Sequence, residues 1–350
     1  MIPEELAGRR IAITGSTGFL GTALVERLLR CAPGSELVLV VRPGRRGAGR
    51  RVERDILRND AFERLRADLG ADEFAKMADR RITAVAGDVT IDGLGLDEEG
   101  RVALASCDLV IHSAASVSFD SPLDQAVEVN LLGPVRIVQT LTELGVTPHL
   151  VAVSTCYVAG SRRGAAPEEA VDASPFFVNV DWRTEVDSAR RIRNETETDS
   201  RTPEHLRDFR EQAHGELGAA GTPSLAAKTE QLRSRWVDDR MAEAGVARAS
   251  SLGFPDAYAY TKALGEIASA EVAGDVPISV VRPAIIESAL AEPSPGWIRG
   301  FRMAEPVIIS YARGLLKEFP GVPEGTIDVI PVDFVVAAIC AVAARGPLGP

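Results

Sequence analysis

A tyrosine and a lysine lie four residues apart in the sequence, at Tyr258 and Lys262. On a helix, this spacing puts the phenol and the ammonium on one face, close enough to interact. A nearby ammonium favours the phenolate and lowers the pKa of the phenol, which prepares a tyrosine to exchange a proton with a substrate oxygen. Tyr258 is therefore a candidate catalytic acid, with Lys262 as its partner. A surface helix with an ordinary Tyr/Lys pair explains the same spacing, so the rest of the chain must decide.

A glycine-rich segment provides a second candidate site, for a nucleotide. It follows the first strand-like run, and helix-spaced leucines come directly after it. Glycines at such a junction let backbone N–H groups and the positive end of a helix approach a pyrophosphate. An ordinary strand-to-helix turn is the alternative, but the position at the first strand–helix junction favours dinucleotide binding. The segment consists of Gly15, Ser16, Thr17, Gly18, Phe19, Leu20 and Gly21.

The elements that must position these residues follow from a regular alternation of short apolar runs with amphipathic segments up to about residue 155. The alternation predicts an α/β fold, a Rossmann-like doubly wound parallel sheet covered by helices on both faces. Ligands of such sheets bind at the carboxyl ends of the strands. The expected strands are 10–14, 36–41, 82–86, 108–112 and 149–154, and the expected helices are about 18–31, 50–69, 97–105 and 122–144.

Residues at the expected strand ends complete the candidate cofactor site. Arg42 follows the second strand, where NAD-selective proteins tend to carry an acid for the ribose 2′-hydroxyl, and a guanidinium there suits the 2′-phosphate of NADPH. Asp88, after the third strand, could accept a hydrogen bond from an adenine amino group, and a turn or helix-capping Asp is an equal alternative. Four more residues at strand ends are assigned to cofactor binding: Val89, Ala114, Ala115 and Pro283.

The amino-acid composition of the chain changes after residue 160. Residues 161–249 are rich in Glu, Arg, Ala and Gln and are punctuated by prolines, so we expect several helices joined by loops. Beyond them we expect a strand at 277–281, an apolar helix at about 297–317, a strand-like run at 326–330 and a closing helix from Val332. The predicted domains are a cofactor-binding domain of residues 1–160 and 250–285, a helical insertion at 161–249, and a C-terminal substrate-binding region at 286–350.

Composition excludes several classes of function. The apolar fraction of 45% indicates a globular protein, and the net charge of −11 argues against general nucleic-acid binding, which needs a basic surface. The four cysteines and four histidines show no metal-ligand spacing, so we expect no metal and a reducing compartment. No signal-peptide pattern opens the chain, and the longest apolar stretch, 334–344, is too short to cross a bilayer, so we expect a cytoplasmic protein. One basic cluster is either a solvated loop or a phosphate-binding patch: Arg42, Arg45, Arg46, Arg50, Arg51 and Arg54.

Several motifs together resemble the extended short-chain dehydrogenase/reductase superfamily, over about residues 9–160 and 250–290. They are the TGxxGxxG turn, Asn130 in an expected helix, Ser154-Thr155 at a strand end, and the YxxxK pair of Tyr258 and Lys262. Within that superfamily the chain is similar to the fatty acyl-CoA reductases, of the male-sterility NAD(P)-binding type, nearly throughout. The similar stretches are 153–158, the long charged insertion, 255–266, 295–298 and 330–333.

The resemblance implies a mechanism for a carbonyl substrate. Tyr258 would protonate the carbonyl oxygen as hydride arrives from the nicotinamide, and Thr155 would donate a second hydrogen bond to that oxygen. Lys262 would hold the nicotinamide ribose and depress the Tyr258 pKa, and Asn130 would support a water and proton path. An ordinary strand-end Thr and a polar packing Asn are the alternatives for Thr155 and Asn130.

The implied activity is NADPH-dependent reduction of a long-chain fatty acyl-CoA thioester to the aldehyde, and on to the primary alcohol if a second NADPH reacts. A reductase of carrier-bound acyl groups or of free aldehydes is a near alternative. A nucleotide-sugar epimerase or dehydratase and a non-catalytic cofactor-binding scaffold are more distant ones. The insertion separates Thr155 from Tyr258 by 103 residues, which is far more than is usual in sugar epimerases and dehydratases of the superfamily.

A long acyl chain also needs an apolar pocket. The resembled family continues into a further C-terminal helical region, whereas this chain stops at Pro350, so we expect part of the acyl-binding surface to be missing. Peripheral membrane contact through the basic segment 42–54 is a further hypothesis. The side chains expected to line the pocket, which a simple core helix would also show, are Trp297, Phe301, Met303, Ile308, Ile309, Tyr311 and Leu315.

Overall fold

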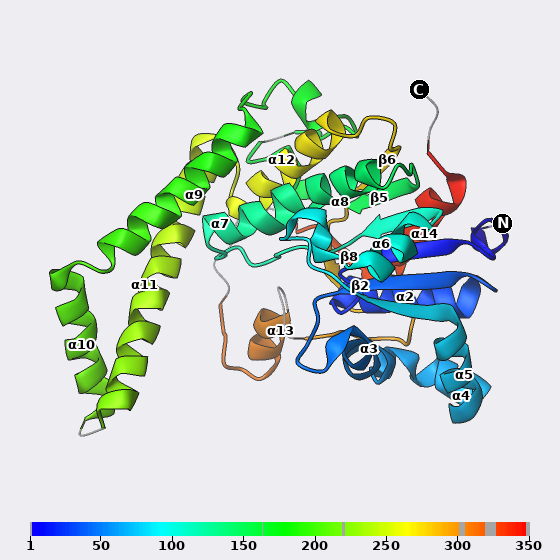
Figure 1. The fold of residues 1–350 in the computed structure, drawn as a ribbon, viewed down its shortest axis with the longest axis horizontal. Helices are drawn as coiled ribbons and strands as arrows, with labels where there is room; N and C mark the ends of the chain where they lie inside the picture. Colours follow the sequence, from blue (N-terminus) through cyan, green and yellow to red (C-terminus); the bar gives the residue numbers. More distant parts are fainter. Residues whose placement is uncertain (1, 163, 219–220, 301–304, 319–326, 348–350) are drawn as a thin grey trace. The chain divides into compact units, whose positions relative to one another are not determined.

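The computed structural model describes residues 2–162, 164–218, 221–300, 305–318 and 327–347. The chain forms two compact units, and each combines segments that lie far apart in the sequence (Figure 1). The first unit contains Met1–Ala114, Arg136–Cys156 and Ala270–Pro350. The second contains Ala115–Val135 and Tyr157–Ser269.

The first unit is built on a six-stranded parallel sheet, which confirms the predicted fold class. Its strand order is β3-β2-β1-β4-β5-β6. The order reverses at β1, so the carboxyl ends of β1 and β4 flank the position where doubly wound sheets bind ligands. The strands are β1 (Arg10–Thr14), β2 (Glu36–Val41), β3 (Ile82–Ala86), β4 (Leu109–His112), β5 (His149–Val153) and β6 (Ile278–Val281), each within one residue of the predicted bounds.

The strands read as continuous apolar runs because helices cover both faces of the sheet. Ile11 on β1 and its partner Leu37 on β2 are completely buried. The helices α2 (Phe19–Cys31) and α14 (Val332–Arg345) contribute to the same apolar core, and α14 confirms the predicted closing helix. Fully burying one such side chain stabilises the fold by about 1.5–3 kcal/mol.

The segment between β2 and β3 differs from the single helix predicted at 50–69. Asn59 interrupts it, because its side chain accepts a hydrogen bond from Ala61 N and starts a new turn. Gly70, at a φ of +80°, ends the following helix and allows another to begin. The elements are α3 (Gly47–Val52), the π-helical turn η1 (Glu53–Leu57), the 3-10 turn η2 (Asp60–Phe62), α4 (Glu63–Leu69) and α5 (Ala71–Arg81).

The helix predicted at 297–317 is wrong in its extent. Residues 297–300 are not helical, and the helix of this region, α13, spans Glu305–Ala312. Trp297 is 5% exposed and packs into the core of the first unit, so its apolar character reflects burial in a loop rather than a helix face. Phe301 and Met303 lie outside the described residues. The remaining elements of this unit are α1 (Ile2–Leu6), η3 (Asp92–Gly95), α6 (Glu98–Ala105), most of α8 (Leu132–Glu143), and the parallel pair of β7 (Ile285–Glu287) and β8 (Val329–Pro331).

The second unit is helical, and it contains residues 161–249, where the sequence predicted several helices joined by loops. Helix α10 (Pro203–Leu217) pairs with α11 (Thr222–Ser251), and α11 also packs against α9 (Trp182–Asp199) (Figure 1). Pro203 and Pro223 stand in the first turns of α10 and α11, where a missing backbone N–H costs nothing. The other elements are α7 (Leu123–Ala126), the π-helical turn η4 (Val127–Leu131), η5 (Cys156–Ala159), η6 (Val171–Ala173) and α12 (Ala257–Glu271). Among the described residues, none of the helices combines the length and the apolar character of a membrane span.

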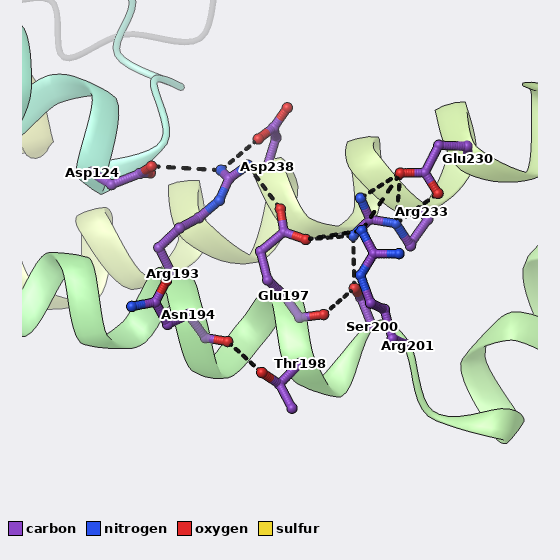
Figure 2. Close-up of polar contacts among 10 residues, drawn as sticks. All are labelled: Asp124, Arg193, Asn194, Glu197, Thr198, Ser200, Arg201, Glu230, Arg233 and Asp238. Atoms are coloured by element: carbon purple, nitrogen blue, oxygen red, sulfur yellow. Dashed lines mark hydrogen bonds and ion pairs between the residues drawn. The ribbon is translucent and has the colours of Figure 1, made fainter.

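An ion-pair network joins the insertion helices to α7 (Figure 2). Arg233 of α11 is only 5% exposed and binds Glu197 of α9 at 2.6 Å. Arg193 of α9 binds Asp238 of α11 at 2.8 Å and lies 3.6 Å from Asp124 of α7. These ion pairs link the polar faces of α9, α11 and α7, and α7 leads directly into the turn that carries Asn130.

Candidate active site

The glycine-rich turn after β1 has a shape that depends on glycine at two positions. Gly15 has a φ of +74°, and a Cβ added there would lie 2.5 Å from Ala114 N. A Cβ on Gly21 would collide with the carbonyl oxygen of Gly15. The turn therefore packs against the strand end and the start of α2 as closely as a dinucleotide-binding turn requires.

The same turn offers polar groups to a phosphate. Helix α2 begins at Phe19, directly after its N-cap residue Gly18, which has no side chain to cap the first turn. The Ser16 side chain is completely buried, and its Oγ has no hydrogen-bond partner among the described residues. Thr17 and Leu20 are half-buried beside it. A buried, unpaired hydroxyl next to uncapped helix N–H groups fits the pyrophosphate of a dinucleotide.

Thr155 directly follows β5, at the carboxyl edge of the sheet. Ser154 N donates to Val281 O at 2.8 Å, and Cys156 N donates to Pro283 O at 3.0 Å. Thr155 lies between these two backbone bonds and is 6% exposed. The structure thus brings Thr155 and Pro283 together at one edge and fixes the backbone of both.

The candidate residues after β3 are engaged within the protein. Asp88 Oδ1 accepts hydrogen bonds from the backbone N of Thr90 at 2.9 Å and from its hydroxyl at 2.8 Å. The carbonyl oxygen of buried Val89 accepts from Arg136 Nη1 at 3.4 Å. Asp88 therefore forms the turn that the sequence left as an alternative, and its contact with adenine stays a prediction.

The arginines of segment 42–54 fall into two groups. Arg50 is paired with Glu53 at 2.9 Å, and Arg54 is paired with Asp55 at 2.5 Å. Arg51 also reaches Asp55, at 3.4 Å. Within the described part of the chain, no ion pair engages the other three, which are exposed directly after β2: Arg42, Arg45 and Arg46. These exposed guanidiniums follow the end of β2, near which Rossmann folds bind the adenosine ribose of a dinucleotide.

Tyr258 and Lys262 lie on α12, one helical turn apart. Lys262 is 6% exposed, and burial lowers the pKa of its ammonium to about 8, although the charge of Glu266 opposes this. Tyr258 is half-buried, and its ring meets that of Phe119 edge-on, with 6.0 Å between the ring centroids. The burial of Lys262 excludes an ordinary surface pair.

Asn130 is held against the helix of Tyr258 and Lys262. It lies in η4 and is 1% exposed. Its Oδ1 accepts from Ser116 N at 2.9 Å, and its Nδ2 donates to Ser116 O at 2.9 Å and to Thr261 Oγ1 at 3.3 Å. Thr261 stands between the two candidate residues on α12. The polar packing considered from the sequence is present, and the π-helical turn is a form that often marks functional sites.

The family model described as "Male sterility protein" matches residues 13–339. The chain belongs to the male sterility protein family. Curated relatives include fatty acyl-CoA reductase 2, chloroplastic, of Arabidopsis thaliana, which is 31% identical over 97% of this chain and 52% of its own length. The alcohol-forming fatty acyl-CoA reductase of Simmondsia chinensis is 30% identical over 96% of this chain and 63% of its own. The resemblance found in the sequence is confirmed, and the chain spans about half to two thirds of these relatives.

Solved structures share the fold of this male sterility family protein. The terminal R domain of the myxalamid PKS-NRPS pathway has a TM-score of 0.60 at 20% identity, covering 95% of this chain and 62% of that one. The DesIV double mutant, a dTDP-glucose 4,6-dehydratase of Streptomyces venezuelae with NAD and DAU bound, has a TM-score of 0.53 at 17% identity, covering 97% and 73%. At these identities the likeness concerns the fold alone.

The contacts that surround α12 were not predicted from the sequence. Glu185 of α9 accepts from the phenol of Tyr260 and from the guanidinium of Arg248. Gly265 faces the carbonyl oxygen of Asn130, which leaves no room for a Cβ. Tyr260 and Gly265 stand inside the motif that singled out α12, but nothing in the sequence links that motif to Glu185.

Proposed function

We propose that this male sterility family protein reduces a long-chain fatty acyl-CoA thioester to the fatty aldehyde with NADPH. The observation that carries the proposal is the ammonium of Lys262, buried one turn from Tyr258 with Asn130 packed on the same helix. The support beyond the site is the similarity to fatty acyl-CoA reductases along nearly the whole chain. The polar, glycine-dependent turn fits the pyrophosphate of the cofactor.

The residues of this chain would act on the carbonyl group of the thioester. When bound, NADPH supplies the hydride that adds to the carbonyl carbon. Tyr258 would donate its phenolic proton to the carbonyl oxygen, and Thr155 would donate a hydrogen bond that stabilises the charge developing there. Lys262 would stabilise the phenolate left on Tyr258 and hold the nicotinamide ribose.

The thioester would then lose its thiol. Addition of hydride and proton gives a hemithioacetal, whose C–S bond breaks while the hydroxyl proton passes to the departing thiolate. One thioester, one NADPH and one proton thus give one aldehyde, one thiol and one NADP⁺. Repetition of the first step on the aldehyde would give a primary alcohol, with Tyr258 and Thr155 in the same roles.

Arg42 and the exposed arginines beside it support NADPH over NADH as the cofactor. A 2′-phosphate carries negative charge that a guanidinium binds through paired hydrogen bonds, whereas the 2′-hydroxyl of NADH offers no such charge. The acyl chain would run along apolar side chains of the C-terminal region. Exposed candidates there are Ile308, Tyr311 and Leu315.

One product analysis tests the proposal. The protein is incubated with NADPH and palmitoyl-CoA, the same acyl group on a carrier protein, or palmitaldehyde, and products are identified by mass spectrometry. We expect aldehyde or alcohol from the CoA ester, and we expect the Tyr258→Phe variant to lose this turnover. Unchanged turnover in that variant would refute the role of Tyr258, and turnover of carrier-bound or aldehyde substrate alone would replace the proposed substrate. NAD retained through purification together with a sugar-nucleotide product would replace the whole assignment.

A further inference from the structure

The loop of residues 289–300, here called the return loop, contacts the glycine-rich turn and its helix. Its base is closed by two backbone hydrogen bonds between Ala289 and the segment of Gly296 and Trp297, at 2.8 and 2.9 Å. The Trp297 ring lies 5.3 Å from the ring of Phe19, the first residue of α2. Its Nε1 donates to Asp60 Oδ1 at 2.8 Å. The return loop therefore bridges the first turn of α2 and η2, which follows the arginine-rich segment of residues 42–58.

Arg299 is placed by this loop at the first turn of α2. Its Nη1 donates a hydrogen bond to Thr22 Oγ1. Thr22 is completely buried, and its own hydroxyl donates to Gly18 O at 2.7 Å. A guanidinium from near the C-terminal end of the chain is thus connected, through one hydroxyl, to the backbone of the turn proposed to bind the dinucleotide.

Arg299 also lies near the arginine-rich segment. The pKa of the Asp55 carboxyl is lowered by a hydrogen bond from Arg54 and by the charges of Arg54, Arg51 and Arg299. Residues 42–58 contain seven arginines and two acids, in a chain whose net charge is −11. Arg299 therefore adds to a local excess of positive charge that lies beside the end of β2.

We propose that Arg299 is a further cofactor-binding residue, which recognises the 2′-phosphate of NADPH together with Arg42. The inference rests on the proposed function and deepens it. In Rossmann folds the 2′ position of the adenosine ribose lies between the glycine-rich turn and the end of the second strand. Arg299 donates to Thr22, beside the glycine-rich turn, and its charge acts on Asp55, in the segment after the second strand. Its planar, permanently charged guanidinium suits a phosphate.

Direct binding measurements test the role of Arg299 without reliance on turnover. The dissociation constants of NADPH, NADH and 2′,5′-ADP are measured by titration for the wild type, Arg299→Gln and Arg299→Lys. We expect Arg299→Gln to weaken NADPH and 2′,5′-ADP about 10- to 100-fold while NADH changes less than about twofold. Arg299→Lys keeps the charge but loses the paired N–H donors of the guanidinium. Its dissociation constant for NADPH should therefore lie between those of the wild type and Arg299→Gln. Trp297→Phe is the matched control, because it removes the bond to Asp60 and leaves every charge in place.

Each outcome decides the inference. Equal weakening of NADPH and NADH by Arg299→Gln would assign the guanidinium to the pyrophosphate and overturn the 2′-phosphate role. An Arg299→Gln variant whose preference for NADPH over NADH is as large as that of the wild type overturns it as well. If Arg299→Gln does not fold, the same comparison of the three ligands with Arg299→Lys decides. If the wild type itself binds NADPH and NADH equally, the proposed NADPH preference fails and the inference falls with it, which distinguishes the two failures.

Discussion

The phenol of Tyr260 on α12 donates a hydrogen bond to Glu185 Oε2 on α9, with 2.5 Å between the two oxygens. Both oxygens of Glu185 also accept from Arg248 of α11, at 2.9 and 2.5 Å. Burial, reinforced by the carboxylate, raises the pKa of Tyr260, so this phenol stays protonated. Because Tyr260 follows Tyr258 by two residues, it lies about 200° around the helix. The insertion therefore anchors the face of α12 opposite to Tyr258 and fixes the rotation of the helix.

Replacing Glu185 by Gln tests this anchor. Burial alone would raise the Glu185 pKa, but the hydrogen bonds from Arg248 and Tyr260 outweigh it and the pKa is lowered. The stabilisation is therefore complete above the ordinary carboxyl pKa of 4.5 and is lost as the pH falls below it. We expect Glu185→Gln to reduce the free energy of unfolding by about 1–3 kcal/mol at pH 7, measured by urea titration, and by less in acid.

A matched control for Glu185→Gln is available on the same helix. Arg190 of α9 pairs with Glu128 at 2.7 Å, but its side chain is 51% exposed. Removing an exposed pair should cost less than about 1 kcal/mol, so Arg190→Ala should leave both stability and kcat nearly unchanged. Equal losses for Arg190→Ala and Glu185→Gln would contradict the anchoring role of Glu185.

Burial of Lys262 has a consequence for stability. Its pKa of about 8 in the fold is below the ordinary value of 10.5, which corresponds to a penalty of about 3 kcal/mol for the buried ammonium. Because the unfolded chain holds the proton up to higher pH, the penalty is full below pH 8 and disappears between about 8 and 10.5. Without cofactor, Lys262→Met should be more stable than the wild type at pH 7, and the difference should shrink above pH 8. A difference that stays constant up to pH 10.5 would contradict the burial of the charge.

Deprotonation of Lys262, which should relieve the penalty on stability, should lower the activity. The ammonium of Lys262 favours the phenolate of Tyr258, so kcat/KM should fall as the pH rises through about 8 and this charge is lost. Arginine keeps its charge in this range, so Lys262→Arg should be slower but should retain its rate to higher pH. The measurement is a pH profile of kcat/KM for both proteins at saturating cofactor. An alkaline limb at the same pH in Lys262→Arg would assign the limb to another group.

Gly265 tests how closely α12 must pack on η4. A Cβ at this position would collide with the carbonyl oxygen of Asn130, so Gly265→Ala should push the helix away and cost about 1–3 kcal/mol of stability. Gly215 in α10 is the matched control, because a Cβ there meets nothing within 4 Å. Gly215→Ala should therefore stabilise by about 0.5–1 kcal/mol through helix propensity. Thermal unfolding of the two variants should show shifts of opposite sign, and a neutral Gly265→Ala would show that η4 and α12 separate easily.

The sheet could be predicted from the sequence because parallel strands buried on both faces consist of short runs of consecutive apolar residues. The bounds of β1, β2 and β3 match the prediction, and the glycine-rich turn and the pair on α12 are also local patterns. The prediction of a single helix at 50–69 was wrong because a side-chain cap such as that of Asn59 starts a new turn without changing the apolar periodicity of the sequence. The helix predicted from Trp297 failed because a large apolar side chain can be buried from a loop as well as from a helix.

The partners of the site residues could not be predicted. Glu185 and Tyr260 are separated by 75 residues, and Arg299 and Thr22 by 277. A polar contact of this kind depends on tertiary packing and leaves no periodic trace in either segment. The sequence therefore identified groups capable of the chemistry, while the residues that orient α12 and connect the return loop to the glycine-rich turn required the structure.

A double-mutant cycle tests whether Thr155 and Tyr258 serve one carbonyl oxygen. Thr155→Val keeps the shape of the side chain and removes its hydroxyl, and Tyr258→Phe removes only the phenolic oxygen. If both groups stabilise the same developing charge, each single change should lower kcat/KM by about 10²–10⁴-fold, and the double variant should lose much less than the product of the two losses. Groups that act in separate steps would instead show additive losses in the logarithm of kcat/KM, which would remove Thr155 from the proposed mechanism.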